Sequence, residues 1–125
     1  MTDPRFDGTG PDAYFWRTLA QGRLELQRCG PCQQDYFPPA LVCPRCGNTD
    51  VHWAQPSGKG QVYATTTVRD RAGDYNVALV DLEGGARMMS RVEGVEPDAV
   101  RVGLQLLARV VQAERPYVVF DLAEK

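Results

Sequence analysis

The 125-residue sequence lacks most of the residue combinations that mark an enzyme active site. It contains no glycine-rich G-x-G-x-x-G or Walker-type loop that would hold a nucleotide phosphate. It has one histidine, His52, so any Ser-His or Cys-His catalytic pair would have to use this residue. The paired acids Asp81 and Glu83 lie beside a glycine turn and are interpreted as solvated charges. The sequence therefore favours a chain that has no covalent chemistry of its own.

Long apolar runs and an excess of positive charge are also missing. No stretch approaches the roughly 20 apolar residues that span a bilayer, and residues 1–16 lack the apolar core of a signal peptide. We therefore expect a cytoplasmic protein whose thiols stay reduced. The 14 basic and 16 acidic side chains give a net charge of −2, which argues against a nucleic-acid phosphate backbone as the main partner.

The four cysteines form two C-x-x-C pairs. Cys29 and Cys32 make the first pair, Cys43 and Cys46 make the second, and ten residues separate the pairs. Two such turns supply four thiolates, which is the tetrahedral ligand set that zinc prefers. Because a closed four-sulfur site leaves no position for a substrate water, the spacing predicts a structural zinc ion.

Three other interpretations use the same cysteines. Iron in a rubredoxin-like site has the same four sulfur ligands and stays open as an alternative to zinc. Two disulfides are disfavoured because the expected compartment is reducing. The tetrapeptide "CGPC" matches a thioredoxin-type redox motif, but that motif needs a helix after it. The following "QQDYFPP" contains two prolines that disfavour a helix.

A short helix is predicted before the cysteines, over residues 11–22. Pro11 suits a first helical turn, and Gly22 is a typical helix end. Residues 1–10 are polar and glycine-rich and are expected to form a mobile tail. Phe15 and Trp16 would lie on the same helix face as Leu19. This aromatic face either packs on the protein's own core or contacts a partner subunit.

The rest of the chain is expected to be mainly β. Leu24 and Leu26 alternate with polar residues, as in a half-buried strand that leads into the first cysteine pair. A turn cluster at 56–60 suggests the boundary of a second domain. Five strands follow without a long helix, which favours the closed five-stranded barrel called the OB-fold. The predicted strands are 61–70, 75–83, 86–94, 104–114 and 117–125. Residues 104–114 also fit helical spacing, but the β-branched pair within them favours a strand.

Several segments together resemble the DUF35 family of acyl-CoA-associated proteins. These segments are "YFWRTLAQG", "RCGPCQQDYFPPALVCPRCG", "SGKGQVYATTTV", "VALVDLEGGARMMSRVEG" and "VGLQLLARV", and the resemblance covers about residues 11–122. It implies a tail and short helix over 1–22, a rubredoxin-like zinc ribbon over 23–56 and an OB-fold over 57–125.

The same resemblance implies a function without catalysis. The chain would be an accessory subunit that binds or positions acyl-CoA and assembles with a thiolase-like enzyme. This enzyme would be a thiolase, an aldolase or a condensing enzyme, for example in steroid side-chain degradation or a related acyl-CoA pathway. The family resemblance makes the four cysteines zinc ligands and gives no specific coenzyme A contacts.

Several residues are candidates for the surface that meets a ligand or partner. A rigid apolar wall between the cysteine pairs is costly to leave in water, and a lysine in the "SGKG" turn could meet a phosphate. With the two helix aromatics, the candidates are Phe15, Trp16, Tyr36, Phe37, Pro38, Pro39 and Lys59.

The alternative function is binding of single-stranded nucleic acid. Zinc ribbons and OB-folds both occur in nucleic-acid-binding proteins, and OB-fold aromatics can stack on bases. Tyr63 and Tyr75, with the arginines between them, would serve this function. The negative net charge argues against it.

Overall fold

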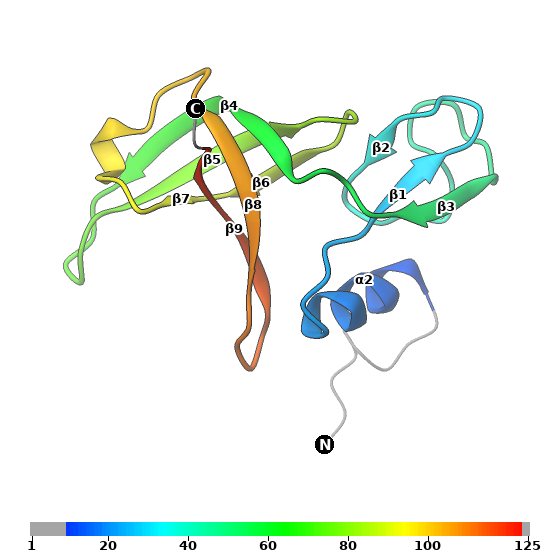
Figure 1. Cartoon of the computed structure of the whole chain (residues 1–125), viewed down its shortest axis with the longest axis horizontal. Coiled ribbons are helices and arrows are strands. Elements are labelled where there is room, and N and C mark those ends of the chain that lie inside the picture. Colours follow the sequence, from blue (N-terminus) through cyan, green and yellow to red (C-terminus); the bar gives the residue numbers. More distant parts are fainter. Residues whose placement is uncertain (1–9, 124–125) are drawn as a thin grey trace. The chain divides into compact units, whose positions relative to one another are not determined.

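The computed structural model describes residues 10–123 (Figure 1). The predicted tail therefore lies almost entirely outside the described residues. The chain divides into two compact units. The first extends to Pro56 and includes the short segments Gly84–Ala86 and Val110–Tyr117. The second contains Ser57–Glu83, Arg87–Arg109 and the chain from Val118 on.

Helix α2 covers Pro11–Ala20, close to the range that the sequence predicts. Proline occupies its first turn, and the chain leaves the helix through Gly22, whose φ of 86° is one that L side chains rarely adopt. The inward helix face carries Ala13, Phe15 and Leu19, all buried. The aromatic helix therefore contributes to the core of its own unit.

Three short strands follow in the first unit. Strand β1 (Leu26–Cys29) lies between β2 (Asp35–Tyr36) and β3 (Val51–Ala54), and both pairings are antiparallel. The first cysteine pair begins at the last residue of β1. This central strand therefore gives the metal-binding sequence a fixed starting point.

The second sheet has six strands, in the order β6-β5-β4-β8-β9-β7. Val62, Val80 and Phe120 are among its fully buried side chains, so they form much of its core. A parallel pairing of Val92 with Phe120 joins β7 to β9. A one-turn 3-10 helix, η1, covers Pro97–Ala99. The strands are β4 (Lys59–Val68), β5 (Tyr75–Leu82), β6 (Arg87–Ser90), β7 (Val92–Glu93), β8 (Gln105–Val111) and β9 (Tyr117–Leu122).

One predicted strand differs from the structure. Residues 86–94 form two strands, β6 and β7, with a break at Arg91. The break arises because the two parts have different partners: β6 pairs with β5, and β7 pairs with β9.

Residues 105–111 are a strand, as the β-branched residues predict, and not the helix that their spacing also allowed. Of the helices described within residues 10–123, none has the length and apolar character of a transmembrane span.

Candidate metal centre and ligand surfaces

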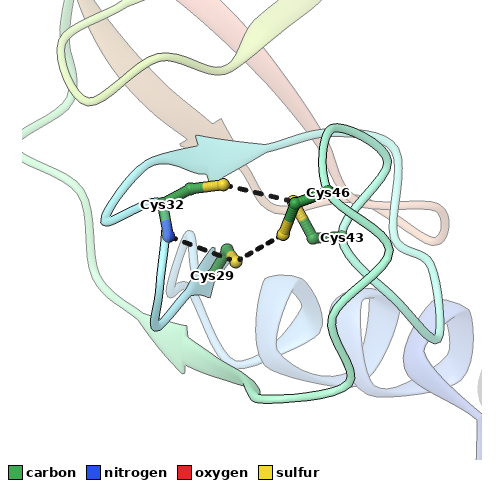
Figure 2. Close-up of side chains that lie close together, drawn as sticks. All are labelled: Cys29, Cys32, Cys43 and Cys46. Carbon is green, nitrogen blue, oxygen red and sulfur yellow. Dashed lines mark hydrogen bonds between the residues drawn. The ribbon is translucent and has the colours of Figure 1, made fainter.

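The four cysteine sulfurs converge at one point of the first unit (Figure 2). All four lie within 4.8 Å of one another. The Sγ atoms of Cys29 and Cys46 are 3.6 Å apart, and those of Cys32 and Cys43 are 4.0 Å apart. Four ligands at the zinc–sulfur distance of about 2.3 Å would be separated by about 3.8 Å at tetrahedral angles. The observed separations therefore fit a tetrahedral metal ion.

The two cysteine turns have the same local geometry. The Gln33 amide donates to the Cys29 carbonyl oxygen at 2.8 Å, and the Gly47 amide donates to the Cys43 carbonyl oxygen at 2.8 Å. Both donors have positive φ, 57° for Gln33 and 76° for Gly47. In each turn an amide also points at the first sulfur: Cys32 N lies 3.5 Å from Cys29 Sγ, and Arg45 N lies 3.4 Å from Cys43 Sγ. Such amides favour the thiolate form that binds metal.

The thiols differ in their tendency to ionise. Burial opposes ionisation of Cys43, but the amides of Cys46 and Arg45 donate to its sulfur, and its pKa is lowered to about 7. The pKa of Cys32 is raised to about 12 by hydrogen bonding with the sulfurs of Cys46 and Cys29 and by burial. Four close thiolates repel one another, so a divalent cation would supply the positive charge that makes full ionisation favourable.

The surroundings of the cluster are those of a structural site. Cys29 and Cys43 are buried with Tyr36 in a small core. The Gln27 side chain exchanges two hydrogen bonds of 2.8 Å with the backbone of Ala40, which fixes the loop before the second cysteine pair. Because all four positions of a tetrahedral ion would be taken by sulfur, a metal here has no site for substrate.

Arg45 links the second cysteine turn to the segment Gly84–Ala86 within the first unit. Its guanidinium donates to the Asp35 carbonyl oxygen at 3.1 Å and to the Gly85 carbonyl oxygen at 3.0 Å. The Asp35 amide donates to the Gly84 carbonyl oxygen at 2.9 Å. The buried side-chain carboxylate of Asp35 accepts a hydrogen bond from Arg28. These polar contacts stabilise the arrangement of the metal-binding turn.

The structure separates the predicted ligand- or partner-facing residues into two groups. Phe15 and Tyr36 are each 3% exposed, so they lie in the core of the first unit and not on a surface for a ligand or partner. The reason is local packing: the rings of Phe15 and Phe37 have centroids 5.1 Å apart, and the Tyr36 hydroxyl donates to the Ala40 carbonyl oxygen. The predicted residues that keep exposed surface are Trp16, Phe37, Pro38, Pro39 and Lys59.

Lys59 lies apart from these aromatic and proline residues, in the second unit. It borders a hollow of about 720 Å³ whose lining includes four leucines. No single sequence segment indicates this hollow, because its lining comes from residues 59, 103–107 and 122–123 on three strands and the adjoining loops. Only the pairing of these strands brings the residues together.

Two of the residues predicted to bind nucleic acid, Tyr63 and Arg69, already have partners within the second unit. The Arg87 guanidinium covers the Tyr63 ring at 3.6 Å and also donates to the Asp81 carboxylate. Arg69 is paired with Asp74 and with a second acid. Base stacking on Tyr63 would have to displace a neutralised arginine, which makes this face poorly suited to single strands.

Comparison with known proteins agrees with this geometry. The family model described as "ChsH2, rubredoxin-like zinc ribbon domain" matches residues 16–52, and "ChsH2, C-terminal OB-fold domain" matches residues 53–111. The structure described as "Ltp2-ChsH2(DUF35) aldolase" is 30% identical, covers 94% of this chain and 98% of that chain, and has a TM-score of 0.78. The fold and the cysteine cluster thus define a zinc-ribbon and OB-fold protein. The chain belongs to the DUF35/ChsH2 family, as the sequence resemblance predicts.

Curated relatives have two kinds of name. A "DUF35 domain-containing scaffold protein" of Methanocaldococcus jannaschii is 33% identical over 65% of this chain and 62% of its own length. A "probable enoyl-CoA hydratase alpha subunit" of Thermomonospora curvata is 31% identical over 82% of this chain. A "3-oxo-4,17-pregnadiene-20-carboxyl-CoA hydratase alpha subunit" of Mycobacterium tuberculosis is 26% identical over 79%. The chain spans only 34% and 33% of these two hydratase subunits.

A Sulfolobus solfataricus protein of the DUF35 family supports the fold alone. It has a TM-score of 0.67 with 18% identity, and it covers 96% of this chain.

Proposed function

We propose that this protein is a non-catalytic scaffold subunit of an enzyme complex that makes or breaks carbon–carbon bonds in acyl-CoA substrates. The observation that carries the proposal is the match to the Ltp2-ChsH2(DUF35) aldolase structure, which extends over 98% of the matched chain. The scaffold-protein names of the archaeal relatives support the same role. The partner would be an aldolase or another thiolase-like subunit.

The metal in this proposal is a structural zinc ion held by Cys29, Cys32, Cys43 and Cys46. The geometry of the cluster supports this assignment, because its sulfur separations fit tetrahedral coordination. When bound, zinc would supply folding energy to the first unit and no chemistry to a substrate. Cytoplasm is the proposed location, since reduced thiols are available to a metal there.

In the complex, the enzyme partner would carry out the chemistry. The sequence offers one histidine, and His52 is exposed on strand β3. The scaffold would complete the partner's assembly and help to position an acyl-CoA substrate, for example in steroid side-chain degradation. Two relatives are named as alpha subunits of hydratases that act on CoA esters, which supports a role for this protein with acyl-CoA substrates.

Affinity purification of the tagged full chain from its native host tests this proposal. We expect an aldolase-like or thiolase-like subunit to co-purify in a fixed ratio, and identification by mass spectrometry would supply its gene. The two subunits would then be produced separately and together and assayed for cleavage of a 3-hydroxyacyl-CoA. We expect activity of the pair and none from this chain alone.

Two results would overturn the proposal. One is thioester turnover by the purified chain without a partner. The other is a cognate enzyme whose solubility, substrate affinity and turnover are the same with and without this chain. A Thr49→Ala variant, changed at an exposed position outside the cysteine pairs, should support the partner as the parent chain does.

A further inference from the structure

The turn between β5 and β6 belongs to the first unit, although both strands belong to the second. We call its residues Gly84–Ala86 the glycine turn. Gly84 and Gly85 have φ of 109° and 115°, values that only glycine adopts readily. Ala86 is 2% exposed, so the turn ends in a buried residue. The glycine turn is therefore part of the packing of the first unit as well as a hairpin connection.

The glycine turn packs closely against the residue that begins β2, just after the first cysteine pair. The Asp35 amide donates to the Gly84 carbonyl oxygen at 2.9 Å. A methyl group added to Gly84 would lie 2.7 Å from Asp35 Oδ2. This carboxylate is 1% exposed and accepts from Arg28 Nε at 2.7 Å, so it has little freedom to turn away. The close contact therefore requires that position 84 has no side chain.

Arg45 joins the glycine turn to the second cysteine pair. It lies between Cys43 and Cys46, and its amide nitrogen is 3.4 Å from Cys43 Sγ. Its guanidinium donates to the Asp35 carbonyl oxygen at 3.1 Å and to the Gly85 carbonyl oxygen at 3.0 Å. One side chain of the metal-binding turn therefore crosslinks the two segments that meet at Gly84.

The position of Arg45 depends on the fold of the second cysteine turn. Its amide faces a ligand sulfur, and the same turn is closed by the Gly47 amide, which donates to the Cys43 carbonyl oxygen at 2.8 Å. A metal ion stabilises this turn, because four thiolates do not stay together without a cation. Contacts that form only in the metal-bound state raise the metal affinity, and the metal strengthens those contacts by the same factor.

We propose that Arg45 and Asp35 form a metal-dependent latch for the glycine turn. The latch holds the turn while the four cysteines bind zinc and releases it when they are empty. Metal occupancy would thereby control the order of a turn that lies far along the chain from the metal ligands. This inference goes beyond the scaffold function, and its test needs no partner protein.

The first test is the heteronuclear 15N NOE of the reduced, 15N-labelled full chain, measured with equimolar zinc and after chelation. We expect high values for Gly84 and Gly85 with zinc and low values without it. Gly73 lies in the turn between β4 and β5, has a φ of 128° and should give the same value in both states. Zinc-loaded Arg45→Met should keep its metal by elemental analysis and show lowered values at Gly84 and Gly85.

The second test measures the effect of the turn on the metal. Gly84→Ala should lower the zinc affinity about three- to tenfold, because its methyl group pushes the turn away from Asp35. Gly73→Ala is the matched control. It also places alanine at a positive φ, but the added methyl group would meet no atom of residues 10–123 within 4 Å, so zinc affinity should be unchanged. Competition with a chelator of known zinc affinity, in reducing buffer, gives both values.

Arg45→Lys separates hydrogen bonding from charge. It keeps a positive charge near the sulfurs but lacks the planar fork that donates to two carbonyl oxygens. Arg45→Met should weaken zinc binding about three- to tenfold, and Arg45→Lys should restore only part of this loss.

Several results would overturn the latch. They are full recovery of zinc affinity in Arg45→Lys, equal zinc affinity of Gly84→Ala and Gly73→Ala, and NOE values at Gly84 and Gly85 that do not depend on zinc. Loss of order throughout the chain after chelation would also overturn it, because the turn would then follow general unfolding. None of these results would affect the scaffold proposal, which depends on co-purification with the enzyme.

Discussion

Gly60 occupies a position in strand β4 that has no room for a side chain. A methyl group on its Cα would lie 2.8 Å from the Asp81 carbonyl oxygen and 3.0 Å from a Val80 methyl carbon. The backbone oxygen cannot move without disturbing the pairing of β4 with β5. We therefore expect Gly60→Ala to lower the free energy of unfolding by about 1–3 kcal/mol in urea denaturation.

Gly10→Ala provides the matched comparison for this substitution. Gly10 has a φ of −78°, and an added methyl group would meet no atom within 4 Å. Because alanine is a weaker helix N-cap than glycine, this variant should lower the free energy of unfolding by about 0.5 kcal/mol. If both variants were equally stable, the close approach at Gly60 would not be a constraint on the sheet.

Asp121 gives a pH-dependent contribution to stability. Arg109 Nε and Nη2 donate to its two carboxylate oxygens at 2.7 and 3.0 Å, and this pairing lowers the pKa of Asp121. A lowered folded-state pKa stabilises the fold above the unfolded-state value of about 3.9, and the contribution is lost as the pH falls through the folded-state value. Asp121→Asn should therefore lower the Tm at neutral pH, by a small amount because the pair is exposed. The difference should vanish in strong acid.

Thermal unfolding of parent and variant at each pH measures this difference directly. Glu114→Gln is a suitable control, because it removes the same charge from an exposed residue that has no ion pair within the described chain. A difference in Tm between Asp121→Asn and the parent that persists below the folded-state pKa of Asp121 would contradict the assignment to this ion pair.

The zinc ribbon is expected to need its metal in order to fold. Its three strands have two to four residues each, and its local core consists largely of Cys29, Tyr36 and Cys43. We expect about one zinc per chain in reduced protein by elemental analysis. Cys43→Ser should lose the metal and the near-UV circular dichroism of the buried Tyr36. Thr49→Ala should keep both.

Metal removal at constant sequence gives a second measure of the same dependence. A chelator should abolish the Tyr36 signal, and added zinc should restore it. Acid should act in the same direction, because the cysteine ligands must be deprotonated to bind metal. A ribbon that keeps its near-UV spectrum without metal would contradict the structural role. Iron in place of zinc would correct the identity of the metal.

Local sequence signals predicted some elements well. Pro11 and Gly22 bracket the helix because both act on the backbone of their own neighbourhood. The cysteine cluster was likewise predictable, since each C-x-x-C turn forms from a few consecutive residues. Strand propensity located the five strand regions of the OB-fold, which the structure and the family match confirm.

Features that depend on distant residues were not predictable. The break at Arg91 follows from the pairing of β7 with β9, far along the chain. The burial of Phe15 depends on a tertiary contact with Phe37, and the sequence left its exposure open. The hollow beside Lys59 takes its lining from three strands that must pair in register, so no single segment carries its pattern.

Considered as a whole, the protein has little capacity for electrostatic attraction to nucleic acid. Its net charge is −2, and Arg69, Arg87 and Arg109 are all paired with carboxylates. We expect no saturable binding of a fluorescein-labelled single-stranded oligonucleotide at micromolar protein in low salt, measured by anisotropy. Micromolar affinity that weakens as salt is added would support nucleic-acid binding instead.

The parallel pairing of Val92 with Phe120 has a consequence for the order of events during synthesis. The cysteines are complete at residue 46, whereas strand β9 covers Tyr117–Leu122. A translating ribosome releases the ribbon sequence first, so the metal can be captured while the barrel is still an open, unpaired set of strands. The sheet of the OB-fold is complete only after β9 has been synthesised. Until then the nascent chain exposes unpaired β-strand edges, which can pair with the wrong strands.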